Sequence, residues 1–325
     1  MLVPVLLFFV GFALLIKGGD WFVDGSVGIA RRFHLPELLI GATIVSIGTT
    51  LPEVMVSTQA AMQGNAGISY GNAIGSIICN TSLIAAITVS VSPGKVQPKS
   101  FILPTAFFFA AALSYAGVAW TLGRFTRWMG LLYLAVFAVY MVLSVAQMKK
   151  NPALAEEGGE EASDAKERSF AIELLLLVVG AVAIALGARF LVDNGTKIAA
   201  ALGVPDSVIG LTMVALGTSL PELITAITSL MKGHGSLSLG NIIGANLFNI
   251  VLVSGASIAI SPFAIPAEKT VLGGINSSLV IDLPIMLAVM AILCLPALKK
   301  GELKRWQGIT LLCIYAAFTV YQFVS

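Results

Sequence analysis

The sequence is poor in charged residues and in the side chains that most often perform catalysis or bind zinc. Only 11% of its 325 residues are Asp, Glu, Lys or Arg, whereas a typical soluble domain has about 25%. There are two histidines and three cysteines. Cys79, Cys294 and Cys313 all fall inside apolar segments without a neighbouring Cys or His, which argues against a disulfide framework or a zinc site. The net charge of +2 comes from residues between apolar segments, so it gives no indication of nucleic-acid binding.

Hydrophobic residues, in contrast, make up 57% of the chain. A helix needs about 20 predominantly apolar residues to cross a bilayer core of about 30 Å. Ten segments meet this requirement, which predicts an all-α polytopic membrane protein with ten transmembrane helices. The predicted spans cover residues 3–30, 37–63, 67–91, 100–122, 127–148, 170–200, 206–231, 236–261, 278–298 and 305–323. The apolar start lacks a basic region and a small-residue cleavage site, so we interpret it as the first span and not as a signal peptide.

Residues 149–169 differ from the rest of the chain because they are mostly acidic and polar. The acidic residues of this segment are Glu156, Glu157, Glu160, Glu161, Asp164 and Glu167. They lack the fixed ligand spacing of an EF-hand loop, which favours a solvated linker over a calcium sensor. We therefore expect a first five-helix repeat over 1–148, an acidic linker over 149–169 and a second five-helix repeat over 170–325.

The distribution of Lys and Arg predicts the orientation in the membrane. If the loop between the first two spans is cytoplasmic, most of the 19 Lys and Arg residues face inward, as the positive-inside rule requires. Both termini then lie outside and the linker 149–169 is cytoplasmic. The expected location is the cell (inner) membrane.

One motif occurs twice in the chain, at residues 41–53 and 210–222, and the copies are 169 residues apart. The same shift aligns residues 41–80 with 210–249, and the matches include Gly, Thr, Pro, Asn and Glu residues. Because each predicted repeat has an odd number of spans, the second repeat must enter the membrane from the opposite side. Inverted repeats of this kind are a recurring plan of secondary transporters, whose binding sites lie near the midplane.

Each copy of the motif places a glutamate directly after a proline, in Pro52–Glu53 and Pro221–Glu222. A charged side chain inside a membrane is by default a functional hypothesis. Proline lacks an N–H and is expected to break the helix and free the carbonyls of Gly48 and Gly217. Carbonyl, hydroxyl and carboxylate oxygens suit hard cations such as Ca²⁺ and Na⁺. The hydroxyls beside the glutamates are those of Thr49, Thr50, Thr218 and Ser219.

A second conspicuous segment follows each motif. Asn72, Ser76 and Asn80 are spaced by four residues, so they share one face of a helix. The other copy reads Asn241, Ala245 and Asn249 at the equivalent positions. These side chains are candidates for one wall of a cation site, although asparagines also join membrane helices by hydrogen bonds.

In these residues the chain resembles the cation/calcium exchanger superfamily, specifically the bacterial sodium/calcium exchangers. The resemblance lies in the motifs 48–53 and 217–222, and in the Gly-Asn-x-x-Gly segments that begin at Gly71 and Gly240. It implies that Glu53 and Glu222 bind calcium and also serve sodium, with long first and sixth helices sliding against the other eight. The further ligands that it implies are backbone carbonyls of Thr49 and Thr218 for calcium, and Ser46, Ala215, Thr50, Ser219, Ser76 and Asn80 for sodium. We include Asn72, Asn241 and Asn249 in the candidate site. The chain departs from the family at Ala245, where a serine is common, and at Asn249, where an acidic residue is common.

These features predict a secondary antiporter, and not an enzyme, that exchanges Na⁺ for Ca²⁺ by alternating access. No cofactor or nucleic acid is expected, and we expect the protein to function as a monomer in the lipid bilayer. Coupling to H⁺ or K⁺ on the same fold is the main alternative. A channel would not need closed sites at the midplane, and a membrane enzyme would lack a nucleophile–histidine pair, since His34 and His234 lie in predicted loops.

Overall fold

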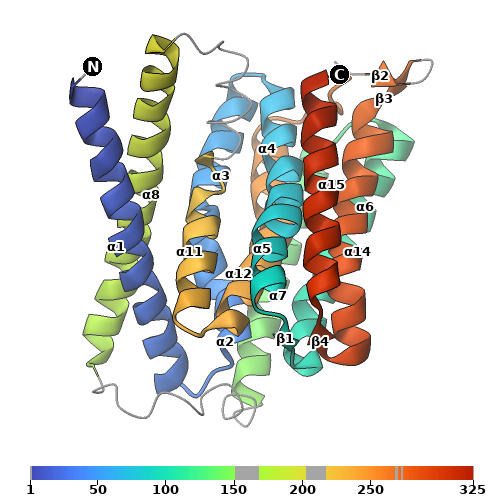
Figure 1. Ribbon diagram of the computed structural model, residues 1–325. Coiled ribbons are helices and arrows are strands. Elements are labelled where there is room, and N and C mark those ends of the chain that lie inside the picture. The colour runs from blue at the N-terminus through green and yellow to red at the C-terminus, as the bar shows by residue number, and fades with distance from the viewer. Residues whose placement is uncertain (1, 151–167, 203–216, 268–269, 272–273, 325) are drawn as a thin grey trace.

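The computed structural model describes residues 2–150, 168–202, 217–267, 270–271 and 274–324, and this part of the chain is almost entirely helical (Figure 1). Several membrane segments combine α-helix with a π-helical stretch, labelled η. The first half contains α1 (Leu2–Arg32), α2 (Glu37–Ile40), η1 (Gly41–Val45), α3 (Ser46–Met62), α4 (Ala66–Cys79), η2 (Asn80–Ala85), α5 (Ala86–Val91), β1 (Gly94–Lys95), α6 (Pro98–Leu122) and α7 (Arg127–Lys150). The second half contains α8 (Phe170–Ala201), α11 (Leu220–Met231), α12 (Gly235–Phe248), η5 (Asn249–Ser254), α13 (Gly255–Ile260), β2 (Thr270–Val271), β3 (Ile275–Asn276), η6 (Ser278–Asp282), α14 (Leu283–Lys300), β4 (Glu302–Leu303) and α15 (Arg305–Val324).

Eight of the described helical segments are long and apolar enough to cross a membrane. They agree with the predicted spans in order and position, and α15 occupies the place of the predicted last span. The predicted seventh span, 206–231, is described only from residue 217, and its helix α11 covers Leu220–Met231. Of the predicted linker 149–169, residues 151–167 lie outside the described residues.

The chain begins and ends at the same end of the helical bundle, where α1 starts and α15 finishes (Figure 1). At the opposite end the short strands β1 and β4 pair antiparallel, with Gly94 opposite Leu303, and so join the two halves of the chain. β2 and β3 form a small antiparallel hairpin beside the end of α15. An even number of membrane crossings explains why both ends lie on the same side of the membrane.

Helices α1 and α8 form a tilted pair at one side of the bundle (Figure 1). The pair is close because glycines meet at the crossing. A Cβ on Gly11 would lie 2.8 Å from the Gly187 oxygen, and a Cβ on Gly180 would lie 2.9 Å from the Gly18 oxygen. The 169-residue shift converts Gly11 into Gly180 and Gly18 into Gly187. The contact is therefore nearly symmetric, and small residues allow the close approach.

Ion pairs connect this helix pair to the rest of the bundle. Lys232, at the end of α11, lies 2.7 Å from an Asp24 carboxylate oxygen and 3.3 Å from one of Asp20, both on α1. Another ion pair, between Arg32 and Glu173 at 2.9 Å, lies within the helix pair itself and joins the end of α1 to the start of α8. The aspartates and Lys232 are partly exposed, so these contacts are of the kind that contributes little net stability.

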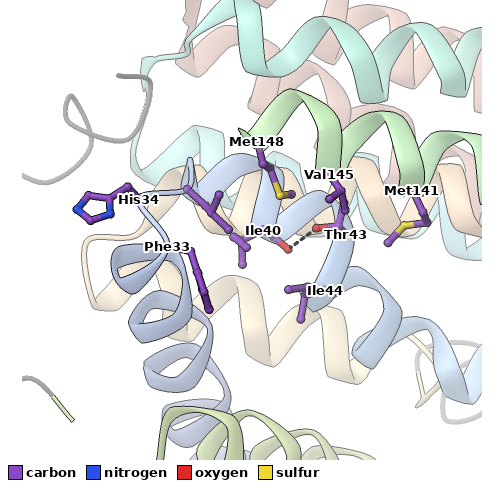
Figure 2. Close-up of a pocket in the computed structure, with 9 residues that line it drawn as sticks. Phe33, His34, Ile40, Thr43, Ile44, Met141, Val145 and Met148 are labelled. Atoms are coloured by element: carbon purple, nitrogen blue, oxygen red, sulfur yellow. Dashed lines mark hydrogen bonds between the residues drawn. The ribbon is translucent and has the colours of Figure 1, made fainter. Parts of the chain in front are cut away.

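A groove of about 340 Å³ lies between the end of α1, the second membrane segment and α7 (Figure 2). Its lining residues are Phe33, His34, Leu35, Ile40, Thr43, Ile44, Met141, Val145 and Met148. The hydroxyl of Thr43 donates to the Leu39 carbonyl oxygen at 2.6 Å, so it presents no free donor to the groove. The groove is thus almost wholly apolar and does not include either motif glutamate.

Replacing Gly180 by alanine should destabilise the protein, because the added Cβ would overlap the Phe22 backbone of α1. Overpacking of this kind typically costs about 1–3 kcal/mol. We expect a lower Tm for Gly180→Ala in detergent, measured by intrinsic fluorescence. The control is Gly117→Ala on α6, where no atom lies within 4 Å of the new Cβ. An unchanged Tm for Gly180→Ala would contradict a tight crossing of α1 and α8.

Candidate ion-binding site

The fold brings the two motif glutamates together at the centre of the bundle. Glu53 lies on α3 and Glu222 on α11, and both side chains are fully buried. The two carboxylates are close enough that they would repel each other if both were ionised. The hydroxyls of Thr49 and Thr50 lie beside the Glu222 carboxylate, so the first half of the chain contributes to the surroundings of the second half's glutamate.

Neither carboxylate has a positive partner within the part of the chain that the structure describes. All four oxygens of Glu53 and Glu222 lack a hydrogen bond of normal geometry there, and no described Lys, Arg or His forms an ion pair with them. A buried charge without a partner costs several kcal/mol. The arrangement therefore favours binding of a cation between the two carboxylates.

The two prolines affect their helices differently. The expected break at Pro52 is wrong, because α3 continues through it from Ser46 to Met62. Proline removes a single N–H donor, and the neighbouring hydrogen bonds of the helix keep the turn intact. At the second copy Thr218 and Ser219 form a turn, and α11 begins at Leu220 with Pro221 in its first turn. The first turn tolerates proline because its N–H groups have no partner within the helix.

Two equivalent hydrogen bonds cross between the halves. Thr49 on α3 donates to the side-chain oxygen of Asn241 on α12 at 3.1 Å. Thr218 donates to the side-chain oxygen of Asn72 on α4 at 3.2 Å. The 169-residue shift relates these two contacts to each other. In both, the motif threonine uses its proton on an asparagine, which leaves its oxygen lone pairs available as acceptors.

Asn80 and Asn249 also occupy equivalent places, because each begins a π-helical stretch, η2 and η5. Both are fully buried, and neither side-chain amide has a hydrogen-bond partner among the described residues. π-helical turns are frequent at functional sites because they disturb the regular hydrogen bonding of the backbone. Their buried amide oxygens are therefore available as neutral ligands for a cation.

Two serines close π-helical stretches by bonding a carbonyl oxygen five residues earlier. Ser46 donates to the Gly41 oxygen at 2.7 Å, and Ser254 donates to the Asn249 oxygen at 2.9 Å. Ser46 also lies 2.9 Å from the backbone oxygen of Asn241, which joins the second membrane segment to α12. Tyr140 on α7 supports the same segment by donating to the Ala42 oxygen at 2.8 Å. The Ser46 hydroxyl is thus used in hydrogen bonds to backbone oxygens. The candidate ligand that the family resemblance implies at this residue is a different atom, the backbone carbonyl oxygen of Ser46.

The remaining candidate residues are also placed, with one exception. Asn72 and Thr218 are partly buried, whereas the other described candidates are buried. The buried candidates are Ser46, Thr49, Thr50, Glu53, Ser76, Asn80, Ser219, Glu222, Asn241 and Asn249. Ala215 lies outside the described residues, and Ala245 is fully buried in α12.

Sequence reasoning overlooked Ser57. It is fully buried on α3, one helical turn after Glu53, and its oxygen accepts a hydrogen bond from the Asn72 amide at 2.8 Å. The spacing of four residues from Glu53 could have identified it, because such residues share a helix face.

The donor set fits a hard cation better than a soft metal. No group of three or more His, Cys, Asp or Glu side chains suitable for a metal occurs among the residues that the structure describes. The candidate residues offer carboxylate, hydroxyl, amide and carbonyl oxygens, and oxygen atoms are the ligands that Ca²⁺ prefers. The ion in this case would be the transported substrate.

Paired acidic motifs on two sets of membrane helices define a class of membrane transporter built from inverted repeats. The model of the family described as sodium/calcium exchanger protein matches residues 3–146 and 172–324, and the chain therefore belongs to this family. Its fold is that of an exchanger with ten transmembrane helices in two inverted repeats. The solved sodium–calcium exchanger NCX_Mj, soaked with Na⁺ and Sr²⁺, superposes with a TM-score of 0.81 at 30% identity, covering 100% of this chain and 99% of that one.

Two curated relatives match over nearly their whole length. The sodium/calcium exchanger MaX1 of Methanosarcina acetivorans is 32% identical over 99% of both chains. The uncharacterized membrane protein MJ0091 of Methanocaldococcus jannaschii is 36% identical over 95% of this chain and 94% of its own. The inner membrane protein YrbG of Escherichia coli is 33% identical over 81% of each chain. These matches and the long apolar helices show that the chain is a multi-pass membrane transporter.

Calcium should stabilise the purified protein, because it neutralises the repulsion between the two buried carboxylates. A ligand at 100 times its Kd stabilises a protein by about 2.7 kcal/mol. We expect Ca²⁺ to raise the Tm of the wild type in a buffer otherwise containing only choline salts. Glu222→Gln should have the higher Tm without Ca²⁺ and a smaller Ca²⁺-dependent increase.

The matched control is Glu302→Gln, because Glu302 is partly exposed and paired with Lys304 at 2.9 Å. It should keep the full Ca²⁺-dependent rise in Tm. A Glu222→Gln variant with a wild-type response to Ca²⁺ would show that this carboxylate does not contact the ion.

Proposed function

We propose that the protein is a secondary antiporter that exchanges Na⁺ for Ca²⁺ across the cell membrane. The observation that carries this proposal is the pair of buried carboxylates of Glu53 and Glu222, contributed by equivalent positions of two inverted halves and without a partner among the residues that the structure describes. Membership of the sodium/calcium exchanger family supports the choice of ions. Transport proceeds without covalent chemistry.

Coupling follows from charge balance at the shared glutamates. One Ca²⁺ or two Na⁺ neutralises two carboxylates, so the ions compete for the same oxygens. The protein changes the side to which the site opens only when the charge is neutralised, because an empty pair of buried carboxylates is costly. Inward flow of Na⁺ then drives Ca²⁺ out.

We propose that α1 and α8 move as a unit against the other helices during alternating access. Their mutual contact is lined by glycines, and the partly exposed ion pairs of Lys232 with Asp20 and Asp24 connect α1 to α11. Partly exposed ion pairs break at low cost. The same proposal includes the division and orientation of the chain. It has two five-helix repeats, 1–148 and 170–325, a cytoplasmic linker at 149–169, and both termini on the external side.

The ligands of the two kinds of ion are proposed by residue. Glu53 and Glu222 bind Ca²⁺ together with the backbone carbonyls of Thr49 and Thr218. The flanking sodium sites use the carbonyls of Ser46 and Ala215 with Thr50, Ser219, Ser76 and Asn80, and Asn72, Asn241 and Asn249 complete the surroundings. Burial of most of these side chains supports this set.

Neutralising either glutamate should abolish exchange. Glu53→Gln and Glu222→Gln each remove a charge that must balance the cation, so we expect less than about one-hundredth of wild-type flux, as for loss of about 3 kcal/mol of ion binding. The measurement is ⁴⁵Ca²⁺ uptake into proteoliposomes driven by an outward Na⁺ gradient. Glu302→Gln serves as the control with normal flux. Full uptake by either site variant would reject the assignment.

The driving ion is tested in the same vesicles by imposing one gradient at a time. Sodium coupling predicts ⁴⁵Ca²⁺ uptake with a Na⁺ gradient alone and none with a K⁺ or H⁺ gradient alone. Uptake under a proton gradient without sodium would instead identify a calcium/proton exchanger of the same fold. A requirement for K⁺ together with Na⁺ would identify potassium-dependent exchange.

A further inference from the structure

The side chain of Asn72 is held at both ends of its amide. Its nitrogen donates to the Ser57 oxygen at 2.8 Å and lies 3.3 Å from the backbone oxygen of Glu53. Its oxygen accepts the Thr218 hydroxyl at 3.2 Å. Because a backbone carbonyl can only accept, the amide nitrogen must face Glu53 and Ser57, and the amide oxygen must face Thr218.

The equivalent asparagine in the second half is held at one end only. Asn241 accepts the Thr49 hydroxyl at 3.1 Å, but its amide nitrogen has no hydrogen-bond partner among the described residues although it is buried. The position equivalent to Ser57 is Ala226, which is also buried and offers no oxygen in its side chain. The two asparagine–threonine hydrogen bonds thus have similar lengths, but only the Asn72 amide is also held at its nitrogen.

This difference determines how firmly each threonine presents its oxygen to the site. A threonine whose proton is given to an amide oxygen keeps its lone pairs for a cation. If the amide turns over, its nitrogen becomes the donor, and the threonine proton must point elsewhere, including toward the cation. If Asn72 turned over, Ser57 could still donate to it, but the amide oxygen would then face the Glu53 carbonyl oxygen, which can only accept, so that contact would be lost. The amide nitrogen of Asn241 makes no such contact among the described residues, so nothing there opposes its turning.

We propose that Ser57 is a positioning residue that, together with the Glu53 carbonyl, holds the Asn72 amide in place, so that the Thr218 hydroxyl is presented as an acceptor for sodium in addition to the ligands proposed above. The absence of such a residue at Ala226 leaves Asn241 and Thr49 free to reverse, which makes the two sides of the site unequal in their affinity for sodium. The proposal rests on the proposed function, because it assumes that Na⁺ and Ca²⁺ compete at Glu53 and Glu222. It adds that selectivity is adjusted by a residue that does not touch either ion.

The test compares Ser57→Ala, Ser57→Thr and Ala226→Ser in purified full-length protein. ⁴⁵Ca²⁺ binding gives the Kd for calcium, and displacement of the bound ⁴⁵Ca²⁺ by NaCl gives the Na⁺ concentration for half-displacement. Loss of one hydrogen bond predicts that Ser57→Ala raises this Na⁺ concentration roughly two- to tenfold. The Kd for calcium should change by less than about twofold, because the carboxylates dominate calcium binding.

The other two variants separate positioning from general loosening of the helices. Ser57→Thr retains the hydroxyl and should behave as the wild type. Ala226→Ser adds a hydroxyl for Asn241 and should lower the Na⁺ concentration for half-displacement by a similar factor, roughly two- to tenfold. An unchanged Na⁺ dependence in Ser57→Ala or Ala226→Ser would overturn the proposal, as would equal changes in the sodium and calcium affinities of Ser57→Ala.

Failure of the proposed function gives a different result. In that case sodium does not displace calcium from the wild type, and proteoliposomes show no sodium-driven calcium uptake. A wild type that exchanges the ions normally, together with variants that match it, contradicts only the role of Ser57.

Discussion

The structure depends on keeping two carboxylates inside a bundle of membrane helices, where no basic side chain of the described residues pairs with them. Glu53 and Glu222 are fully buried and would repel each other if both were ionised. Such a pair is costly in a medium of low dielectric constant. Every nearby feature that offers an oxygen to a cation reduces this cost, including the motif hydroxyls and the unpartnered amides of Asn80 and Asn249. A permanent Lys or Arg partner would also reduce it, but it would compete with the transported ion.

The inverted repeat explains how the two glutamates come to lie close together. One short motif, used twice in opposite orientations, brings two glutamates to one place and directs each motif threonine to an asparagine of the other half. The same symmetry places glycine against glycine where α1 crosses α8. Close packing therefore occurs at two places, at the helix pair and at the ion site, and the partly exposed ion pairs of Lys232 connect them.

Departures from the symmetry are as informative as the symmetry itself. In the first half α3 continues through Pro52, whereas in the second half α11 begins at Leu220, directly before Pro221. Ser57 supports Asn72, whereas Ala226 offers nothing to Asn241. An exchanger must bind ions of different charge and number at one pair of carboxylates. In the mechanism that we propose, unequal sides allow the neutral ligands to distinguish these ions while the glutamates are shared.

The sequence by itself determined the membrane class, the order of the helices and the two glutamates, because hydrophobic length and a motif repeated after 169 residues are local properties of the chain. It also indicated Asn72, Asn80, Asn241 and Asn249 through their helical spacing. It was wrong about a break at Pro52, since one missing donor did not outweigh the surrounding helix. Only the tertiary structure decided which threonine contacts which asparagine and that Ser57 accepts a hydrogen bond from Asn72. These contacts join residues from different helices, and their distances depend on how the whole bundle packs.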